Sequence, residues 1–101
     1  MLAASSRAGY NQLVTPVSQT IRVKVLFFGR LKELIGRAED SAETPDALTI
    51  EQLFGLYVAQ HRELANYRSS VVASRNQEFV AWDTLLRSGD EVAFLPPVSG
   101  G

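Results

Sequence analysis

Residues 91–101 read EVAFLPPVSGG, an alternating apolar segment followed by two prolines and a pair of glycines. The alternation predicts a last strand at 91–95, with Val92 and Phe94 on one face and the other side chains opposite. Pro96 and Pro97 favour polyproline II and act as a semi-rigid spacer. We therefore predict a strand that leads into a projecting tail, residues 96–101, which is flexible toward its tip.

The tip of this tail is the strongest candidate for chemistry. Glycine has no Cβ, so Gly100 and Gly101 fit into spaces that exclude other residues. From Pro96 to Gly101 the tail reaches roughly 20 Å, at about 3.3–3.6 Å per extended residue, which is deep enough for a partner's active site. The pattern indicates a reactive carboxylate on Gly101, presented at the end of a stalk.

The composition excludes several classes of function. The 101 residues suit one domain with a modest core, and 46% hydrophobic and 21% charged residues are typical of a globular protein. A formal net charge of −1 gives no sign of a nucleic acid or an anionic membrane as partner. The absence of cysteine excludes disulfide scaffolds, cysteine-ligated zinc, iron–sulfur clusters and thiol nucleophiles. Any sulfur chemistry must therefore take place at the terminus or on a partner.

Residues 1–20 differ from the rest, because they hold no Asp or Glu and only one basic residue, Arg7. We interpret them as a disordered extension or a misassigned start, outside a folded domain at 21–101. A targeting peptide is the alternative, but a single arginine and no long apolar stretch support it poorly. The apolar run at residues 25–28, which no other run exceeds in length, is also too short to span a membrane. We expect the protein in the cytoplasm.

The remaining pattern predicts an α+β domain. Residues 21–28 form a strand, 30–35 a short helix ending at Gly36, and 37–47 an acidic, turn-rich segment with at most a short edge strand. Thr49 and Gln52 match a capping box, which begins a main helix at roughly 49–65. Short strands follow at 71–74, 79–81 and 91–95. This order predicts a mixed sheet that wraps one principal helix.

Catalysis by side chains is poorly supported. His61 is the single histidine and is expected to be a solvated or partly packed residue on the main helix, without a nucleophile to activate. Glu39, Asp40 and Glu43 are expected in a solvated loop and not at a metal site. No phosphate-binding glycine loop occurs, because Gly29 and Gly36 have the wrong spacing.

The second candidate site is an apolar patch. On the first strand Ile21, Val23, Val25 and Phe27 share the core face, which leaves Leu26 and Phe28 opposite. If the first and last strands pair, Leu26, Phe28 and Leu95 form an apolar surface ringed by Arg22, Lys24 and Glu91. Such a surface beside the root of the tail is typical of a docking site, unless a helix or loop covers it.

These motifs together resemble one known family. Five stretches carry this resemblance: residues 25–28, the Lys32-Glu33-Leu34 helix, the Asn76-Gln77 turn, residues 89–94 and the closing string 96–101. They are similar to the small, sulfur-carrying subunits of molybdopterin synthase. The resemblance covers about residues 21–101. It implies a ubiquitin-like β-grasp fold, with a mixed sheet of four to five strands packed on one main helix.

The resemblance also implies a mechanism in which the chain is a co-substrate. A ubiquitin-activating-like enzyme would use ATP to adenylate the Gly101 carboxylate, and sulfur from a donor protein would replace AMP to give a thiocarboxylate. The tail would then enter the large subunit and transfer sulfur to cyclic pyranopterin monophosphate. Two such transfers would build the dithiolene that holds molybdenum. The implied assembly is a heterotetramer of two small and two large subunits, and no cofactor is bound by this chain alone.

The family's contact residues carry over by position. Phe28, Lys32 and Leu95 correspond to residues that contact the activating enzyme or the large subunit. The tail residues expected to lie inside the partner's channel and contact it are Pro96, Pro97, Val98, Ser99 and Gly100. Some relatives have a second aromatic at the position of Leu95 and an Arg at that of Lys32, whose bidentate contact a lysine cannot reproduce. The N-terminal extension also departs from bacterial members.

Three other functions remain open at this stage. The chain could be a thiocarboxylate carrier for thiamine, cysteine or tRNA thiolation. It could also be a ubiquitin-like interaction module that is never activated, or a modifier attached to lysines. The Leu95-Pro96-Pro97 approach to the glycines favours the pterin pathway.

Overall fold

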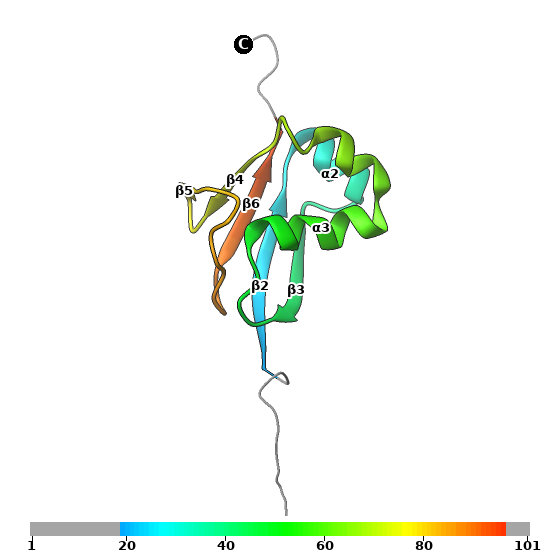
Figure 1. The fold of residues 1–101 in the computed structure, drawn as a ribbon. Coiled ribbons are helices and arrows are strands. Elements are labelled where there is room, and N and C mark those ends of the chain that lie inside the picture. Colours follow the sequence, from blue (N-terminus) through cyan, green and yellow to red (C-terminus); the bar gives the residue numbers. More distant parts are fainter. Residues whose placement is uncertain (1–18, 97–101) are drawn as a thin grey trace, which may run out of the picture.

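The computed structural model describes residues 19–96, which form one sheet with helices packed on one of its faces (Figure 1). Residues 1–18 and 97–101 lie outside the described part, so the predicted N-terminal extension and the tail beyond Pro96 stay predictions. The elements in chain order are β2 (Thr20–Phe27), α2 (Gly29–Ile35), β3 (Glu39–Pro45), α3 (Ile50–Gln60), the 3₁₀ helix η3 (Arg62–Tyr67), β4 (Val72–Arg75), β5 (Glu78–Phe79) and β6 (Glu91–Leu95). None of the helices within residues 19–96 has the length and apolar character needed to cross a membrane.

The sheet places the first and last strands side by side at its centre. Its order is β3-β2-β6-β4-β5, in which β2 and β6 are parallel and all other neighbours are antiparallel. In Figure 1, α3 crosses in front of β2. This five-stranded mixed sheet wrapped on one principal helix is the β-grasp fold, so the predicted fold is confirmed.

The helix starts agree with the sequence, but the main helix ends early. The Thr49 hydroxyl accepts a hydrogen bond from the Gln52 N–H at 3.1 Å, and the Gln52 side chain accepts one from the Thr49 N–H at 2.9 Å. The prediction of one helix over 49–65 is wrong, because α3 stops at Gln60. His61 leaves helical geometry, with φ −137° and ψ 85°, and the chain continues as η3. His61 therefore lies at a junction, half-buried, and not on the main helix.

Two strand lengths also differ from the prediction. The acidic segment forms a full edge strand, β3, that pairs with β2 from Thr20 to Leu26. Glu39, Asp40 and Glu43 therefore lie on a strand, which corrects their placement in a solvated loop. The hairpin strand predicted at 79–81 is shorter and earlier, at Glu78–Phe79, after a turn in which Asn76 and Gln77 have positive φ.

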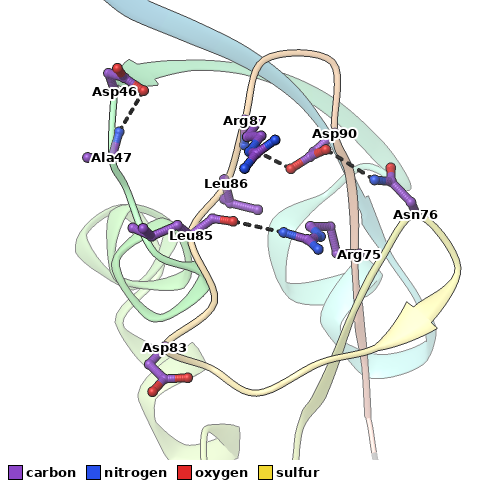
Figure 2. A pocket seen from close by; sticks show the side chains of 9 residues that line it. All are labelled: Asp46, Ala47, Arg75, Asn76, Asp83, Leu85, Leu86, Arg87 and Asp90. Atoms are coloured by element: carbon purple, nitrogen blue, oxygen red, sulfur yellow. Dashed lines mark hydrogen bonds between the residues drawn. The ribbon is translucent and has the colours of Figure 1, made fainter.

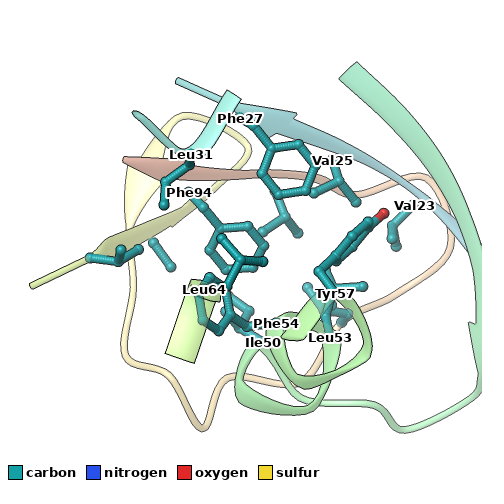
Figure 3. Packing of buried hydrophobic residues seen from close by; sticks show 14 of the residues in the cluster. Val23, Val25, Phe27, Leu31, Ile50, Leu53, Phe54, Tyr57, Leu64 and Phe94 are labelled. Carbon is teal, nitrogen blue, oxygen red and sulfur yellow. The ribbon is translucent and has the colours of Figure 1, made fainter. Parts of the chain in front are cut away.

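The core lies between the sheet and the helices (Figure 3). Phe94 on β6 is fully buried, with its ring centroid 5.0 Å from that of Phe54 on α3 and 6.1 Å from that of Phe27 on β2. Val92 on the same face is also fully buried. The predicted faces of β2 and β6 are thus confirmed.

A partly buried hydrogen bond joins α3 to the edge strand. The Tyr57 hydroxyl donates to Asp40 Oδ2 at 2.8 Å, and Arg37 binds the other carboxylate oxygen at 3.0 Å. Burial, with the contact to Asp40 as a second cause, raises the pKa of Tyr57 above its ordinary value.

This bond predicts loss of stability at high pH. The unfolded chain releases the tyrosine proton near pH 10, whereas folded Tyr57 keeps it. Its contribution is therefore complete below about pH 10 and is lost as the pH rises through the higher folded-state pKa. Urea unfolding at neutral and alkaline pH should show that the free energy of unfolding falls less with rising pH in Tyr57→Phe than in the unmodified chain. Equal declines would contradict the prediction.

Candidate functional site

The face of the sheet that points away from the core is the candidate docking surface. Strand register places on it Arg22, Lys24 and Leu26 of β2, Glu91, Ala93 and Leu95 of β6, Val72 and Ser74 of β4, and Phe79 of β5. The buried side chains of α2, α3 and η3 all join the core on the opposite face. Within residues 19–96, no helix therefore covers this surface.

An apolar patch occupies the part of this face nearest the tail. We call it the open-face patch and define it as Leu26, Phe28, Val72, Phe79 and Leu95. The side chains of Phe28, Val72 and Phe79 are 45%, 47% and 76% exposed, and the two leucines are partly exposed. Exposed apolar side chains that gather in this way are typical of a protein interface.

The sequence pattern predicts only part of this patch. Charged neighbours on β2 and β6 mark the outward face and predict Leu26, Phe28 and Leu95, whereas Val72 and Phe79 are not predicted. In β4, Val72 shares a face with Ser74 and Ala73 shares the other with Arg75, so each face mixes apolar and polar residues and the pattern does not assign them. Only the pairing of Val72 with Leu95 places it on the patch.

Charged pairs border the patch on the β3 side. Arg22 lies 3.7 Å from Glu43, and Lys24 lies 3.6 Å from Glu39, each pair joining β2 to β3. All four side chains are more than half exposed, so these pairs contribute little to stability. Their arrangement gives the apolar surface a polar rim, as protein interfaces have.

Lys32 adds a free positive charge beside Phe28. The two residues lie four apart in sequence at the start of α2, where the Lys32 N–H approaches the Phe28 carbonyl at 3.4 Å. Lys32 is exposed and makes no ion pair with any residue in the range 19–96. Its neighbour Arg30 instead binds Glu33 at 2.9 Å.

A shallow apolar groove extends the patch past Val72. It has a volume of about 310 Å³ and is lined by Val72, Ala73, Phe79, Val80 and Trp82. The Arg68 guanidinium lies 3.5 Å above the Trp82 ring and also binds Glu51. The Arg68 contact lowers the pKa of Glu51, which keeps this pair charged.

The root of the tail lies at the same edge of the sheet. Because β2 and β6 are parallel and Phe27 pairs with Phe94, both strands end together. Pro96 then lies against Gly29, the first residue of α2. The structure thus brings together four of the predicted site residues, Phe28, Lys32, Leu95 and Pro96. The other five, Pro97, Val98, Ser99, Gly100 and Gly101, lie outside the described residues.

A cavity larger than the apolar groove lies at the opposite end of β6 (Figure 2). Its volume is about 730 Å³, and its lining includes Arg75, Asn76, Arg87 and Asp90. The Asp90 carboxylate accepts hydrogen bonds from Asn76 Nδ2 at 3.1 Å and from the Arg87 N–H at 2.8 Å. Arg75 donates to the Leu85 carbonyl at 3.0 Å. These hydrogen bonds hold the loop before β6 in place. We therefore assign the residues that line this cavity a role in the fold and not in binding.

The acidic residues of the described chain do not form a metal site. Glu39, Asp40 and Glu43 pair with Lys24, Arg37 and Arg22 across or along the edge of the sheet. Between residues 19 and 96, no three His, Cys, Asp or Glu side chains gather closely enough to hold a metal ion.

Known proteins resemble this chain over the same region. Residues 25–101 match the model of the ThiS family. The molybdopterin synthase sulfur carrier subunit of Escherichia coli is 42% identical over 78% of this chain and 99% of the relative. The corresponding protein of Chlamydomonas reinhardtii is 36% identical over 80% of this chain and 100% of the relative. A solved structure from Pyrococcus furiosus, provisionally assigned as subunit 1 of molybdopterin converting factor, is 29% identical with a TM-score of 0.70, over 77% of this chain and 99% of that one.

Proposed function

The chain belongs to the ThiS family of ubiquitin-like β-grasp proteins, and we propose from this membership that it is the sulfur carrier subunit of a molybdopterin synthase. The structural observation that carries the proposal is the position of Phe28 and Leu95 around Pro96. The docking patch adjoins the root of the tail, because Leu95 precedes Pro96 and Phe28 precedes Gly29, against which Pro96 lies, so a partner that binds the patch is placed beside the tail.

The chemistry of the proposed function takes place at Gly101. A carboxylate repels nucleophiles and has no good leaving group, so we propose that ATP is used by an activating enzyme to form an acyl adenylate. Sulfur supplied by a donor protein at the oxidation level of sulfide then displaces AMP and leaves a thiocarboxylate. The ionised form of sulfur is the nucleophile. It attacks cyclic pyranopterin monophosphate bound to the large subunit and displaces an oxygen substituent there. Water then cleaves the acyl–sulfur bond, which returns the Gly101 carboxylate and leaves the sulfur on the pterin.

The carrier itself supplies no catalytic side chains in this proposal. Its only histidine lies at the α3–η3 junction, away from the tail root, and the chain has no cysteine. The large subunit must therefore provide the acid, the base and the phosphate-binding groups. Two small and two large subunits form the proposed heterotetramer, and we propose that it works in the cytoplasm.

Reconstitution of the reaction tests the proposal. The thiocarboxylated chain is mixed with purified large subunit and cyclic pyranopterin monophosphate, and the dithiolene product is measured. Formation of that product supports the proposal. A chain that gains sulfur but yields no dithiolene is a carrier for another pathway. A chain whose intact mass never shows oxygen replaced by sulfur, in a host with the activating enzymes, is a non-activated module.

The open-face patch predicts which residue anchors the docking. Phe28→Ala should weaken binding to the large subunit by roughly 10- to 100-fold, because exposed aromatic residues commonly anchor interfaces. Stability should change little, since Phe28 is 45% exposed. Calorimetric titration measures the binding, and thermal unfolding measures the stability.

Leu56→Ala is the matched control for this prediction. Leu56 is 44% exposed but lies on α3, on the helical side of the sheet. Its removal should leave the affinity within about twofold. Equal losses of affinity in the two variants would move the docking surface away from the open face.

A further inference from the structure

Gly29 and Pro96 are in contact where the tail leaves the sheet. A Cβ atom built on Gly29 would lie 2.9 Å from Pro96 Cγ, closer than real Cβ atoms come to other atoms. The proline ring therefore occupies the space that any side chain at position 29 would need. The contact joins the start of α2 to the first residue after β6.

Two other glycines show that this contact is separate from backbone conformation. Gly29, Gly36 and Gly89 have φ of +57°, +91° and +92°, so all three adopt a conformation that favours glycine. A Cβ at Gly36 or Gly89 would meet no atom within 4 Å. Among the glycines of residues 19–96, only Gly29 combines the left-handed conformation with contact to the tail root.

We infer that Gly29 is a positioning residue for sulfur transfer, because its bare Cα sets the direction in which Pro96 sends the tail from the sheet. This inference rests on the proposed function of Gly101. Proline fixes its own φ near −65°, so the placement of the Pro96 ring largely determines the path of the next residue. A side chain at position 29 must push that ring away.

The reacting acyl group of Gly101 lies five residues beyond Pro96 in the sequence. A change in the direction of the chain at Pro96 therefore changes the path by which Gly101 must reach its place in the partner. A misplacement of about 1 Å is enough to slow a positioned reaction by about 100-fold. Leu26, Val72, Phe79 and Leu95 of the docking patch are held by the sheet, whereas Phe28 directly precedes Gly29, so docking must be measured separately from sulfur transfer.

A double-mutant cycle tests the contact. Gly29→Ala, Pro96→Ala and the double variant are prepared as thiocarboxylates by sulfide cleavage of a C-terminal thioester, which bypasses the activating enzyme. The single-turnover rate of sulfur transfer is measured at saturating large subunit, and the dissociation constant is measured separately. Gly29→Ala should lower the rate at least about tenfold and change the dissociation constant by no more than about twofold. In the Pro96→Ala background, Gly29→Ala should lower the rate by less than about twofold, because the ring is gone.

Gly36→Ala is the control for backbone strain. It imposes the same kind of left-handed strain at the other end of α2, so its melting temperature should fall as that of Gly29→Ala does, whereas its transfer rate should equal the wild-type rate. An unchanged rate in Gly29→Ala overturns the inference. So does an equal loss in Gly36→Ala, or a full tenfold loss in the Pro96→Ala background.

Nuclear magnetic resonance separates this inference from the proposed function. The amide signals of Leu95 and Val98 should shift in Gly29→Ala and stay unchanged in Gly36→Ala. A wild-type chain that transfers no sulfur refutes the proposed function, and shifted signals then still support Gly29 as the residue that directs the tail. Unshifted signals overturn the inference whatever the activity.

Discussion

Deletion of Gly101, or addition of one alanine after it, is expected to abolish sulfur transfer while the fold and the docking remain. Either change moves the terminal acyl group by about one residue, roughly 3.5 Å along an extended tail. Because a misplacement of about 1 Å already slows a positioned reaction by about 100-fold, we expect no dithiolene above background. This is the largest functional effect that the proposed mechanism predicts.

Four measurements on these variants check the result. Circular dichroism and thermal unfolding should match the wild-type chain, because no core residue is changed. Binding to the large subunit should persist through Phe28 and Leu95. The intact mass of each variant, after incubation with the activating enzyme, ATP and a sulfur donor, should not show the replacement of oxygen by sulfur that marks a thiocarboxylate. Undiminished cofactor synthesis with an unprocessed extra alanine would refute the role of the terminal acyl group.

Local patterns predicted the parts of the fold that local chemistry determines. The capping box of Thr49 and Gln52 marks the start of α3, because those side chains satisfy free backbone groups within one turn. The end of α3 has no such signal. No glycine or proline follows Gln60, and the apolar spacing from Tyr57 to Leu64 continues, so the pattern predicted a longer helix. In the structure, η3 brings Leu64 into the core by a different path.

The candidate site shows the same division. Alternation on β2 and β6 was enough to predict that Leu26, Phe28 and Leu95 face outward together. The contact between Gly29 and Pro96 could not be predicted in this way. It depends on the parallel register of β2 and β6, which pairs Phe27 with Phe94, and residues far apart in sequence set that register.

The alternation of β6 makes one strand serve both the core and the docking surface. Phe94 points inward and is fully buried, whereas Leu95 points to the open face. The position of Leu95 and of the tail root therefore depends on how firmly Phe94 holds the strand. A change at Phe94 should affect docking without touching the partner.

Phe94→Ala is accordingly expected to cause the largest loss of stability. The Phe94 ring lies 5.0 Å from Phe54, 5.7 Å from Trp82 and 6.1 Å from Phe27, measured between centroids. Removal of a buried phenylalanine side chain lowers the free energy of unfolding by about 3–5 kcal/mol, out of a total of about 5–15 kcal/mol for a typical domain. Urea denaturation should show a much lower midpoint, and at elevated temperature docking should be lost with the fold.

Phe79→Ala is the matched control, because Phe79 lies on the same sheet but is 76% exposed. Its free energy of unfolding should change by no more than about 0.5 kcal/mol. Its affinity for the large subunit should fall, since Phe79 belongs to the open-face patch and lines the apolar groove. The two phenylalanines should therefore give opposite patterns: Phe94→Ala loses stability first and docking as a consequence, whereas Phe79→Ala loses affinity alone. If the two variants unfold at the same urea concentration, β6 is not anchored by Phe94, and the coupling between the core and the tail root is absent.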